Sequence, residues 1–284
     1  MSHFAIAGLQ LASSCSNNLK HISEQLINCK KRFPWVDMMV LGELNSFGPE
    51  KKYAEPMPGP TEAFYCELAK ELDVWLIPGS HYEKLDEQIF NTAVVIDNQG
   101  KVVSRYRKIF PFCPYESDVA GGQDILVFDV PQGRIGLAIC YDLWFPEIAR
   151  NMACAGAELL IYPTMTGTID RDIELNMAKA TAATNQCYLM AINTVGELGN
   201  GKSIVVGPQG NEIYLAGELP EIIPIEIDFA QVRRDRDRGL HNLGQPLKSF
   251  RDNQAKITRI SNSQNSEFLH TLGPLTLPGK RTDK

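Results

Sequence analysis

One stretch of the sequence, residues 133–147, constrains the fold more than any other. It begins as an apolar strand at Gly133, stops at Cys140, and resumes at Pro146 as a helix that we expect over residues 145–155. Proline favours the first position of a helix because its missing N–H has no partner there in any case. We therefore expect Cys140 on a tight turn between a strand and a helix, with its sulfur at the edge of a sheet.

A cysteine on such a turn suits a nucleophile. Backbone N–H groups of the turn and of the nearby helix N-terminus would face the sulfur of Cys140 and favour its thiolate. The same groups could stabilise the charge on a carbonyl oxygen under attack. The alternative is a buried structural thiol that ends a core strand, since free cysteine is often buried. This stretch alone leaves both interpretations open.

The composition is that of an ordinary globular protein. The chain has 284 residues, 44% hydrophobic and 22% charged, with a formal net charge of -6. This acidic balance argues against nucleic acid or an anionic membrane as a partner. No apolar run is long enough to span a bilayer, and the N-terminus is typical of a first strand, not of a signal peptide. The 7 cysteines are scattered without a CxxC pair. We therefore expect no metal site, no disulfide framework, and a reducing, cytoplasmic compartment.

Hydrophobic periodicity predicts strands and helices in alternation. The predicted strands cover residues 4–12, 36–41, 74–78, 89–96, 101–107, 125–130, 133–140, 157–162, 188–193, 202–206 and 221–227. The predicted helices cover residues 17–32, 61–73, 145–155 and 170–186, followed by a short charged helix capped by Asp228. This order implies mixed sheets with crossover helices, and two packed sheets covered by helices fit it well.

Several local features of these helices can be predicted. We expect Thr61 to cap the second helix. Apolar residues at helical spacing mark the buried faces of two helices: Leu19, Ile22, Leu26 and Cys29 in the first, and Ile173, Met177 and Ala180 in the helix over residues 170–186. The mixed-sign run 233–238 predicts a solvated face. From about Gln245 the chain loses its periodicity.

Two charged residues stand at the ends of predicted strands. Glu43 follows the buried strand 36–41, and Lys108 follows the strand 101–107. Ligands of layered α/β folds bind at strand ends. On local evidence a carboxylate at the rim and a solvated lysine remain the simpler explanations. The long loop 109–123 contains Glu116 and the pair Gly121-Gly122, and long ordered loops are often functional.

Taken together, Glu43, Lys108 and Cys140 resemble the Glu-Lys-Cys triad of the nitrilase superfamily of carbon–nitrogen hydrolases. Four local matches within residues 4–250 carry the resemblance: Leu41-Gly-Glu43, Tyr106-Arg-Lys108, Ile139-Cys140-Tyr-Asp142 with Phe145-Pro-Glu147, and Pro114-Tyr-Glu116 with Gly121-Gly122. The resemblance implies an α/β fold, a four-layer αββα sandwich with two mixed β-sheets. It implies one domain over residues 1–250, with residues 251–284 as a C-terminal tail or oligomerisation arm.

The resemblance also implies an activity. The protein is expected to be an amidase that converts a small carboxamide to the carboxylic acid and ammonia through a thioester acyl-enzyme. Glu43 would act as general base for Cys140, and Lys108 would stabilise the oxyanion together with the backbone N–H of Tyr141. Glu116 would position the substrate or Lys108, or share the proton transfers. This chemistry requires no metal and no organic cofactor.

The resemblance extends to substrate contacts and assembly. Tyr141 and Trp144 follow the nucleophile, and Tyr115 precedes Glu116. Thr164 follows the strand 157–162 at the same sheet edge and begins the loop 164–168, which is expected to line the site. These four residues are expected to bind substrate, with a core tryptophan and a plain loop as the alternatives for Trp144 and Thr164. The loop 110–116 most resembles that of aliphatic amidases and formamidases. A homodimer or higher homo-oligomer is implied.

Other functions stay open. Within the superfamily, N-carbamoyl compounds or nitriles could replace the amide, and an amine could replace water as the acceptor. A Cys-His hydrolase would need a histidine near Cys140, and His81 is the histidine that follows a buried strand. A non-catalytic binding protein on the same fold is a further alternative, although the intact triad argues against it. Leu44 after the first glutamate and a short C-terminal region depart from the aliphatic amidases, so the amidase class is predicted without a named substrate.

Overall fold

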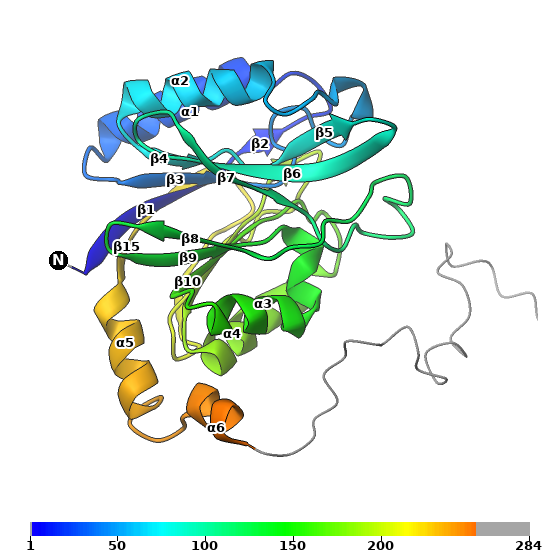
Figure 1. The fold of residues 1–284 in the computed structure, drawn as a ribbon. Coiled ribbons are helices and arrows are strands. Elements are labelled where there is room, and N and C mark those ends of the chain that lie inside the picture. Colours follow the sequence, from blue (N-terminus) through cyan, green and yellow to red (C-terminus); the bar gives the residue numbers. More distant parts are fainter. Residues whose placement is uncertain (1, 254–284) are drawn as a thin grey trace, which may run out of the picture.

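The computed structural model describes residues 2–253, which form two large β-sheets with helices on their outer faces (Figure 1). The first sheet has the strand order β15 (Glu221–Asp228), β1 (His3–Gln10), β3 (Met38–Leu41), β4 (Trp75–Ile77), β6 (Gln88–Ile96) and β5 (His81–Leu85), and β7 (Val102–Arg107) also pairs with β6. The second has the order β14 (Glu212–Leu215), β13 (Ile204–Val206), β11 (Tyr188–Ile192), β10 (Leu159–Pro163), β9 (Gly133–Leu137) and β8 (Leu126–Val130). The short strands β2 (Ala12–Ser13) and β12 (Val195–Gly196) pair with each other. Both large sheets contain parallel and antiparallel pairs.

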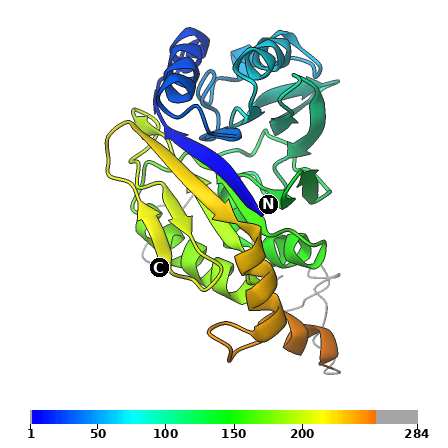
Figure 2. The ribbon, with the colours of Figure 1, turned by 90° about the vertical axis from the view of Figure 1, so that its left-hand side faces the viewer.

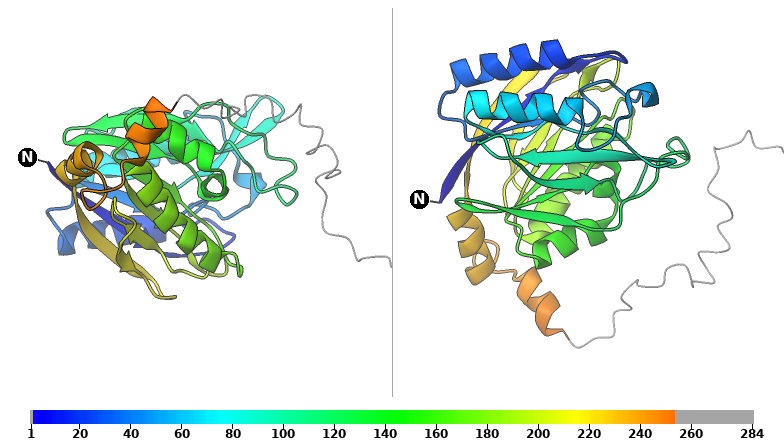
Figure 3. Two further views of the ribbon diagram at one scale, coloured as in Figure 1. Left: turned by 90° about the horizontal axis from the view of Figure 1, so that it is seen from below. Right: turned by 45° about the horizontal axis from the view of Figure 1, so that its top comes forward.

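The helices complete four layers. In Figure 1, α1 (Leu19–Arg32) and α2 (Pro60–Leu72) lie on one side of the sheets, and α3 (Pro146–Cys154) and α4 (Arg171–Asn185) lie on the other. Figure 3 shows α3 and α4 side by side when the molecule is seen from below. In Figure 2, β15 runs beside β1 and leads directly into α5 (Phe229–Arg238), which α6 (Pro246–Asp252) follows. The predicted αββα sandwich with two mixed sheets is confirmed.

The core explains this layering. Alternate residues of a strand point to opposite faces of its sheet. In β3, Met38 and Val40 pack between the two sheets, whereas Met39 and Leu41 pack under α1 and α2. The strand is apolar throughout because both of its faces are buried.

Most predicted elements are present. The α1 face is buried as expected, and the Asp228 carboxylate accepts a hydrogen bond from the backbone N–H of Ala230 at the start of α5. The prediction that Thr61 caps α2 was wrong. Pro60 takes the first helical position after Gly59, and Thr61 lies inside the first turn, where its N–H donates to Glu55 Oε1.

The predicted buried face of α4 was right only at Met177, which is partly buried against the core. Ile173 is half exposed and Ala180 is exposed, whereas Arg171 and Glu174 are buried together with the small residues Ala178 and Ala182. Helix α4 buries its charged residues because they pair with each other, as described below.

Other differences lie in polar segments. The sequence did not predict β5, β14 or α6, whose short polar segments carry little periodicity. The run 233–238 is only partly solvated. Arg236 reaches under the sheet, where it donates to the carbonyls of Ala157, Asn185 and Gln186. Of the predicted tail over residues 251–284, residues 254–284 lie outside the described part. No helix within residues 2–253 is long and apolar enough to cross a membrane.

Candidate active site

Cys140 opens a short 3₁₀ helix, η2 (Cys140–Trp144), between β9 and α3. Its φ is +44°, in the left-handed region that residues other than glycine rarely adopt. The buried carboxylate of Asp142 holds this turn. It accepts hydrogen bonds from the backbone N–H groups of Ile139 and Phe110, at 3.0 and 2.9 Å, and from the hydroxyl of Tyr106 at 2.7 Å. Strained backbone persists where the surrounding structure fixes it in this way.

Lys108 follows β7 and points between the sheets. Its Nζ lies 2.8 Å from Glu43 Oε1 and 2.9 Å from Glu116 Oε2, so one ammonium bridges two carboxylates. Lys108 and Glu43 are each 2% exposed. A charged lysine at this depth requires such partners.

Both glutamates are held by further donors. The Nδ2 of Asn91, a buried residue of β6, donates to Glu43 Oε1 at 2.8 Å. The backbone N–H of Phe112 donates to Glu116 Oε2 at 2.6 Å, which fixes the loop against Lys108. Glu43, Lys108 and Glu116, which lie far apart in the sequence, thus form one hydrogen-bonded cluster.

The protonation of the cluster follows from burial and charge. Burial raises the pKa of Glu43, and the charge of Lys108 opposes this effect. Burial alone would lower the pKa of Lys108, but the negative charges beside it, above all that of Glu43, outweigh burial and raise that pKa well above its usual range. Burial and the charge of Glu43 raise the pKa of Cys140 well above that of an ordinary thiol. This raised pKa favours the thiol form of Cys140, against the effect expected from the turn, and attack by the sulfur of a thiol requires a base.

Aromatic side chains of the loop 109–123 and of η2 lie together next to this cluster. The rings of Phe112 and Tyr115 stack with their centroids 5.0 Å apart, and Tyr141 packs edge-on against Phe112 at 4.9 Å. Tyr115 is 61% exposed. Trp144 is half-buried next to Tyr141, and its indole N–H donates to Glu174 Oε1 at 3.4 Å. The structure thus places three of the four predicted substrate-binding residues in one aromatic group.

Thr164 takes a different place. Its hydroxyl donates to the carbonyl of Tyr162 at 3.0 Å, and its own carbonyl accepts a hydrogen bond from the N–H of Glu43 at 3.1 Å. The loop hydroxyl in contact with Cys140 belongs to Thr166, whose Oγ1 lies 3.8 Å from Cys140 Sγ. Thr164 therefore supports the chain at Glu43 through its backbone.

Sequence reasoning missed three features of the site: Asn91, Glu174, and the role of Asp142 in holding the turn. It indicated Thr166 only as part of the loop 164–168. A polar residue inside the apolar strand 88–96 was a usable signal for Asn91, because buried polar groups need partners. Glu174, Ala178 and Ala182 are spaced four residues apart, so they share one face of α4. This spacing predicts a buried Glu174 only if the two alanines are first identified as buried.

The competing histidine belongs to another cluster. His81 lies in β5, and its Nε2 is 3.8 Å from Glu55 Oε1. Burial lowers the pKa of His81 to about 4, against the charges of Glu62 and Glu83. Those carboxylates differ from the groups that act on Cys140, so the structure gives the Cys-His alternative no support. Residues 2–253 also contain no group of three or more His, Cys, Asp or Glu side chains placed to hold a metal ion.

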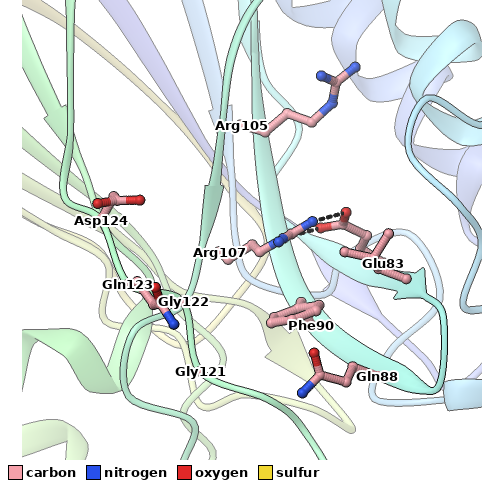
Figure 4. A pocket seen from close by; sticks show the side chains of 10 residues that line it. Glu83, Gln88, Phe90, Arg105, Arg107, Gly121, Gly122, Gln123 and Asp124 are labelled. Atoms are coloured by element: carbon pink, nitrogen blue, oxygen red, sulfur yellow. Dashed lines mark hydrogen bonds and ion pairs between the residues drawn. The ribbon is translucent and has the colours of Figure 1, made fainter.

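A cavity of about 500 Å³ lies on the other face of β7 (Figure 4). There, Arg107 donates to both carboxylate oxygens of Glu83 and lies 4.3 Å from the centre of the Phe90 ring. Arg105 forms the same two-bond pair with Glu62 of α2. Each arginine is matched by one glutamate, and Cys140 is not part of the lining. This cavity is distinct from the Cys140 cluster.

Comparisons with known proteins agree with this geometry. The family model described as carbon-nitrogen hydrolase matches residues 4–237. The human deaminated glutathione amidase is 32% identical over 225 residues, 68% of this chain and 69% of that protein. The N-carbamoylputrescine amidase of Solanum lycopersicum is 34% identical over 209 residues, 64% and 69% of the two chains.

A yeast relative has a solved structure. The omega-amidase NIT3 of Saccharomyces cerevisiae is 29% identical over 251 residues, 78% of this chain and 86% of that protein. The crystal structure of yeast Nit3, described as a member of branch 10 of the nitrilase superfamily, superposes with a TM-score of 0.77 over 83% of this chain and 94% of that chain. The chain therefore belongs to the carbon–nitrogen hydrolase family, in the nitrilase superfamily, and is an enzyme that acts on carbon–nitrogen bonds other than peptide bonds.

Proposed function

We propose that this protein is a cysteine amidase that converts a small carboxamide to the carboxylic acid and ammonia. The observation that carries the proposal is the Lys108 ammonium, which bridges Glu43 and Glu116 beside a cysteine on a strained turn. A buried carboxylate with a raised pKa suits a general base, and a buried cation suits the stabilisation of an oxyanion.

The residues account for each step of the reaction. Glu43 takes the proton of Cys140 as the sulfur bonds to the carbonyl carbon, and Lys108 and the backbone N–H of Tyr141 stabilise the oxyanion. The carbon–nitrogen bond then breaks, and Glu43 returns the proton to the leaving ammonia. Water attacks the thioester with Glu43 again as the base, and the acid leaves as Cys140 regains its proton. Glu116 keeps Lys108 in place through the 2.9 Å contact.

The aromatic group shapes the proposed substrate site. Tyr141 and Trp144 wall the acyl side, and Tyr115 and Phe112 form the rim at the entrance. Such a wall suits a small acyl group with little charge. The human and yeast relatives, both named as amidases, support an amide substrate. The relative from Solanum lycopersicum supports N-carbamoyl compounds as the second candidate class.

The test is ammonia release from a panel of short amides, N-carbamoyl compounds and nitriles. We expect release from the amides by the wild type and none by the variant Cys140→Ala. Cys154→Ala is the matched control, because Cys154 is an exposed thiol in α3, and this variant should behave as the wild type. Release that survives in Cys140→Ala would overturn the mechanism, and release from N-carbamoyl compounds alone would favour the second class.

We also propose a homo-oligomeric, cytoplasmic protein with one catalytic domain over residues 1–250 and an oligomerisation arm over residues 251–284. The family match over residues 4–237 supports the domain, and seven free cysteines suit a reducing compartment. Light scattering of the full chain and of a chain ending at residue 253 tests the arm. A monomeric full chain contradicts the proposed assembly, and an unchanged mass after truncation contradicts the role of the arm.

A further inference from the structure

Thr166 presents a hydroxyl to the nucleophile from a fixed position. Its Oγ1 lies 3.8 Å from Cys140 Sγ. The fully buried Asn193 holds the Thr166 backbone from both sides: the N–H of Thr166 donates to Oδ1 at 2.8 Å, and its carbonyl accepts from Nδ2 at 2.9 Å. The hydroxyl therefore has little freedom to leave the sulfur.

The direction of this hydroxyl is set by Glu174 of α4. Oγ1 of Thr166 lies 3.1 and 3.0 Å from the two carboxylate oxygens of Glu174. An ionised carboxylate only accepts hydrogen bonds, so Thr166 donates its single proton to Glu174. Fully buried Arg171 supplies the matching positive charge, with its NH1 3.0 Å from Oε2 of Glu174.

It follows that Thr166 offers only lone pairs to the sulfur. The contact between Thr166 Oγ1 and Cys140 Sγ must be an S–H···O hydrogen bond with the cysteine as donor. If Cys140 were a thiolate, the lone pairs of Sγ and of Thr166 Oγ1 would face each other with no proton between them. The backbone N–H of Met165, which donates to the same sulfur, acts in the opposite sense. Thr166 thus favours the thiol form of Cys140.

The geometry points to Thr166 as a further catalytic residue, in contact with the reacting sulfur, and to Glu174 as the positioning residue that fixes its hydroxyl as an acceptor. Together they hold Cys140 as a neutral thiol until Glu43 removes the proton, an inference that rests on the proposed role of Cys140 as the nucleophile. During attack the proton of Sγ moves to Glu43 as the sulfur–carbon bond forms. Thr166 keeps its own proton, directed at Glu174, throughout. A resting thiol reacts more slowly with oxidants and alkylating reagents than a thiolate does.

Other charged groups also surround the sulfur. Glu43 and Lys108 act on it from the ends of β3 and β7, and Glu116 acts on Lys108 from the loop 109–123. Asp142 lies in the same turn as Cys140 and is bound by Tyr106. Substitutions at Thr166 and Glu174 leave all four of these groups in place.

The test measures the rate at which methyl methanethiosulfonate modifies Cys140 across a range of pH. The full-length protein is used, and the peptide that contains Cys140 is quantified by mass spectrometry. In Glu174→Gln the new amide can donate to Thr166 Oγ1, which frees the hydroxyl to donate to the sulfur. We expect the midpoint of the pH profile to fall by about one unit, which makes modification about tenfold faster below the midpoint.

A double-mutant cycle separates the hydroxyl from the charge of Glu174. The charge of Glu174 also raises the pKa of Cys140 directly. If Thr166 mediates a further effect, Glu174→Gln shifts the profile more in the wild-type background than in the Thr166→Val background. No shift in the first background, or equal shifts in both, would overturn the inference. If Glu174→Gln does not fold, the pair Thr166→Val and Thr166→Ser decides. Valine should move the profile and serine should keep it, and a valine profile that overlays the wild type contradicts the inference.

Two controls complete the experiment. Thr168→Val removes a hydroxyl from the same loop, where it contacts Asp170 instead of the sulfur, and should leave the profile unchanged. The modification of Cys140 needs no turnover. A failure of the amidase proposal appears as ammonia release that survives in Cys140→Ala, whereas a failure of this inference appears only in the modification profiles.

Discussion

The two faces of β7 carry charged clusters built from the same residue types but with different balance. On the outer face, Arg105 pairs with Glu62 and Arg107 with Glu83, one cation to one anion, and both arginines are more than one third exposed. At the end of the same strand, Lys108 turns inward, where one buried cation serves two carboxylates and a thiol.

This difference separates a structural ion pair from a reactive one. In a matched pair near solvent, each charge is neutralised by its partner and does not act on a substrate. The inner cluster holds more acids than bases in a buried place, so a proton there can move between Glu43 and Cys140 at low cost. Burial and charge imbalance, rather than the residue types, mark the site.

The largest effect is expected from Lys108→Met, which removes the ammonium but keeps an unbranched side chain. Loss of the proposed oxyanion donor should lower kcat/KM for a short amide by about 10³-fold. Arg107→Met makes the same kind of change one residue earlier, on the outer face. Its kcat/KM should stay within about twofold of the wild type, while Glu83, left without its partner, should lower the free energy of unfolding by about 1–3 kcal/mol. Equal losses of activity in the two variants would contradict the distinction between the faces.

Glu116→Gln tests the charge imbalance through pH. The acid limb of kcat/KM reports the base of the free enzyme. In the proposed mechanism Glu43 acts as the base only when it is deprotonated, so activity is lost as the pH falls through its pKa. Burial raises that pKa, and the charge of Glu116 raises it further. Removal of this charge should move the acid limb to lower pH, while kcat falls about 10²-fold.

The control for this variant lies in the same loop. Asp118 is exposed and pairs with Lys51 outside the cluster, so Asp118→Asn should leave the acid limb in place. A limb that stays fixed or moves to higher pH in Glu116→Gln would show that Glu43 is not the group being titrated.

Asn91→Leu should move the same limb in the opposite direction. The Nδ2 of Asn91 donates to Glu43 Oε1 and so stabilises the charged form of that carboxylate. Without this donor the pKa of Glu43 should rise, the acid limb should move to higher pH, and kcat/KM at the optimum should fall about tenfold. An unmoved limb in the pH profile of Asn91→Leu would mean that Asn91 only fills space.

Local sequence could predict the chemical groups of the site but not their supports. Glu43, Lys108 and Cys140 each follow a strand, and the edge of a sheet brings strand ends together. The turn at Cys140 was predictable because Pro146 marks the start of α3. The bridging position of Lys108 was not predictable from local sequence, because it depends on Glu116 in a separate loop, and only the family resemblance related Glu116 to Lys108.

Helix α4 shows why periodicity fails at a functional site. Its apolar residues Ile173 and Ala180 face outward, while the charged Arg171 and Glu174 are buried. Burial of these two residues is stable because they pair with each other and with Thr166, a partner in another element. The spacing of apolar residues indicates only which side chains favour burial away from water. It does not reveal polar partners that lie far away in the sequence.

The smallest effect is expected from Arg105→Met. Its dependence on salt concentration distinguishes the outer cluster of β7 from the inner one. The side chain of Arg105 is 37% exposed although Glu62 is buried, so solvent weakens their pair, which should contribute only about 1 kcal/mol to the free energy of unfolding, with no change in kcat/KM. Ions screen such a pair strongly at about 1 M salt, where the Debye length is about 3 Å. The difference in unfolding free energy between wild type and Arg105→Met, measured by urea denaturation, should therefore shrink from low to high salt. The loss of activity in Lys108→Met should persist at both, because buried charges are screened much less. A salt-independent Arg105 effect would place that pair with the inner cluster and remove the difference between the two faces of β7.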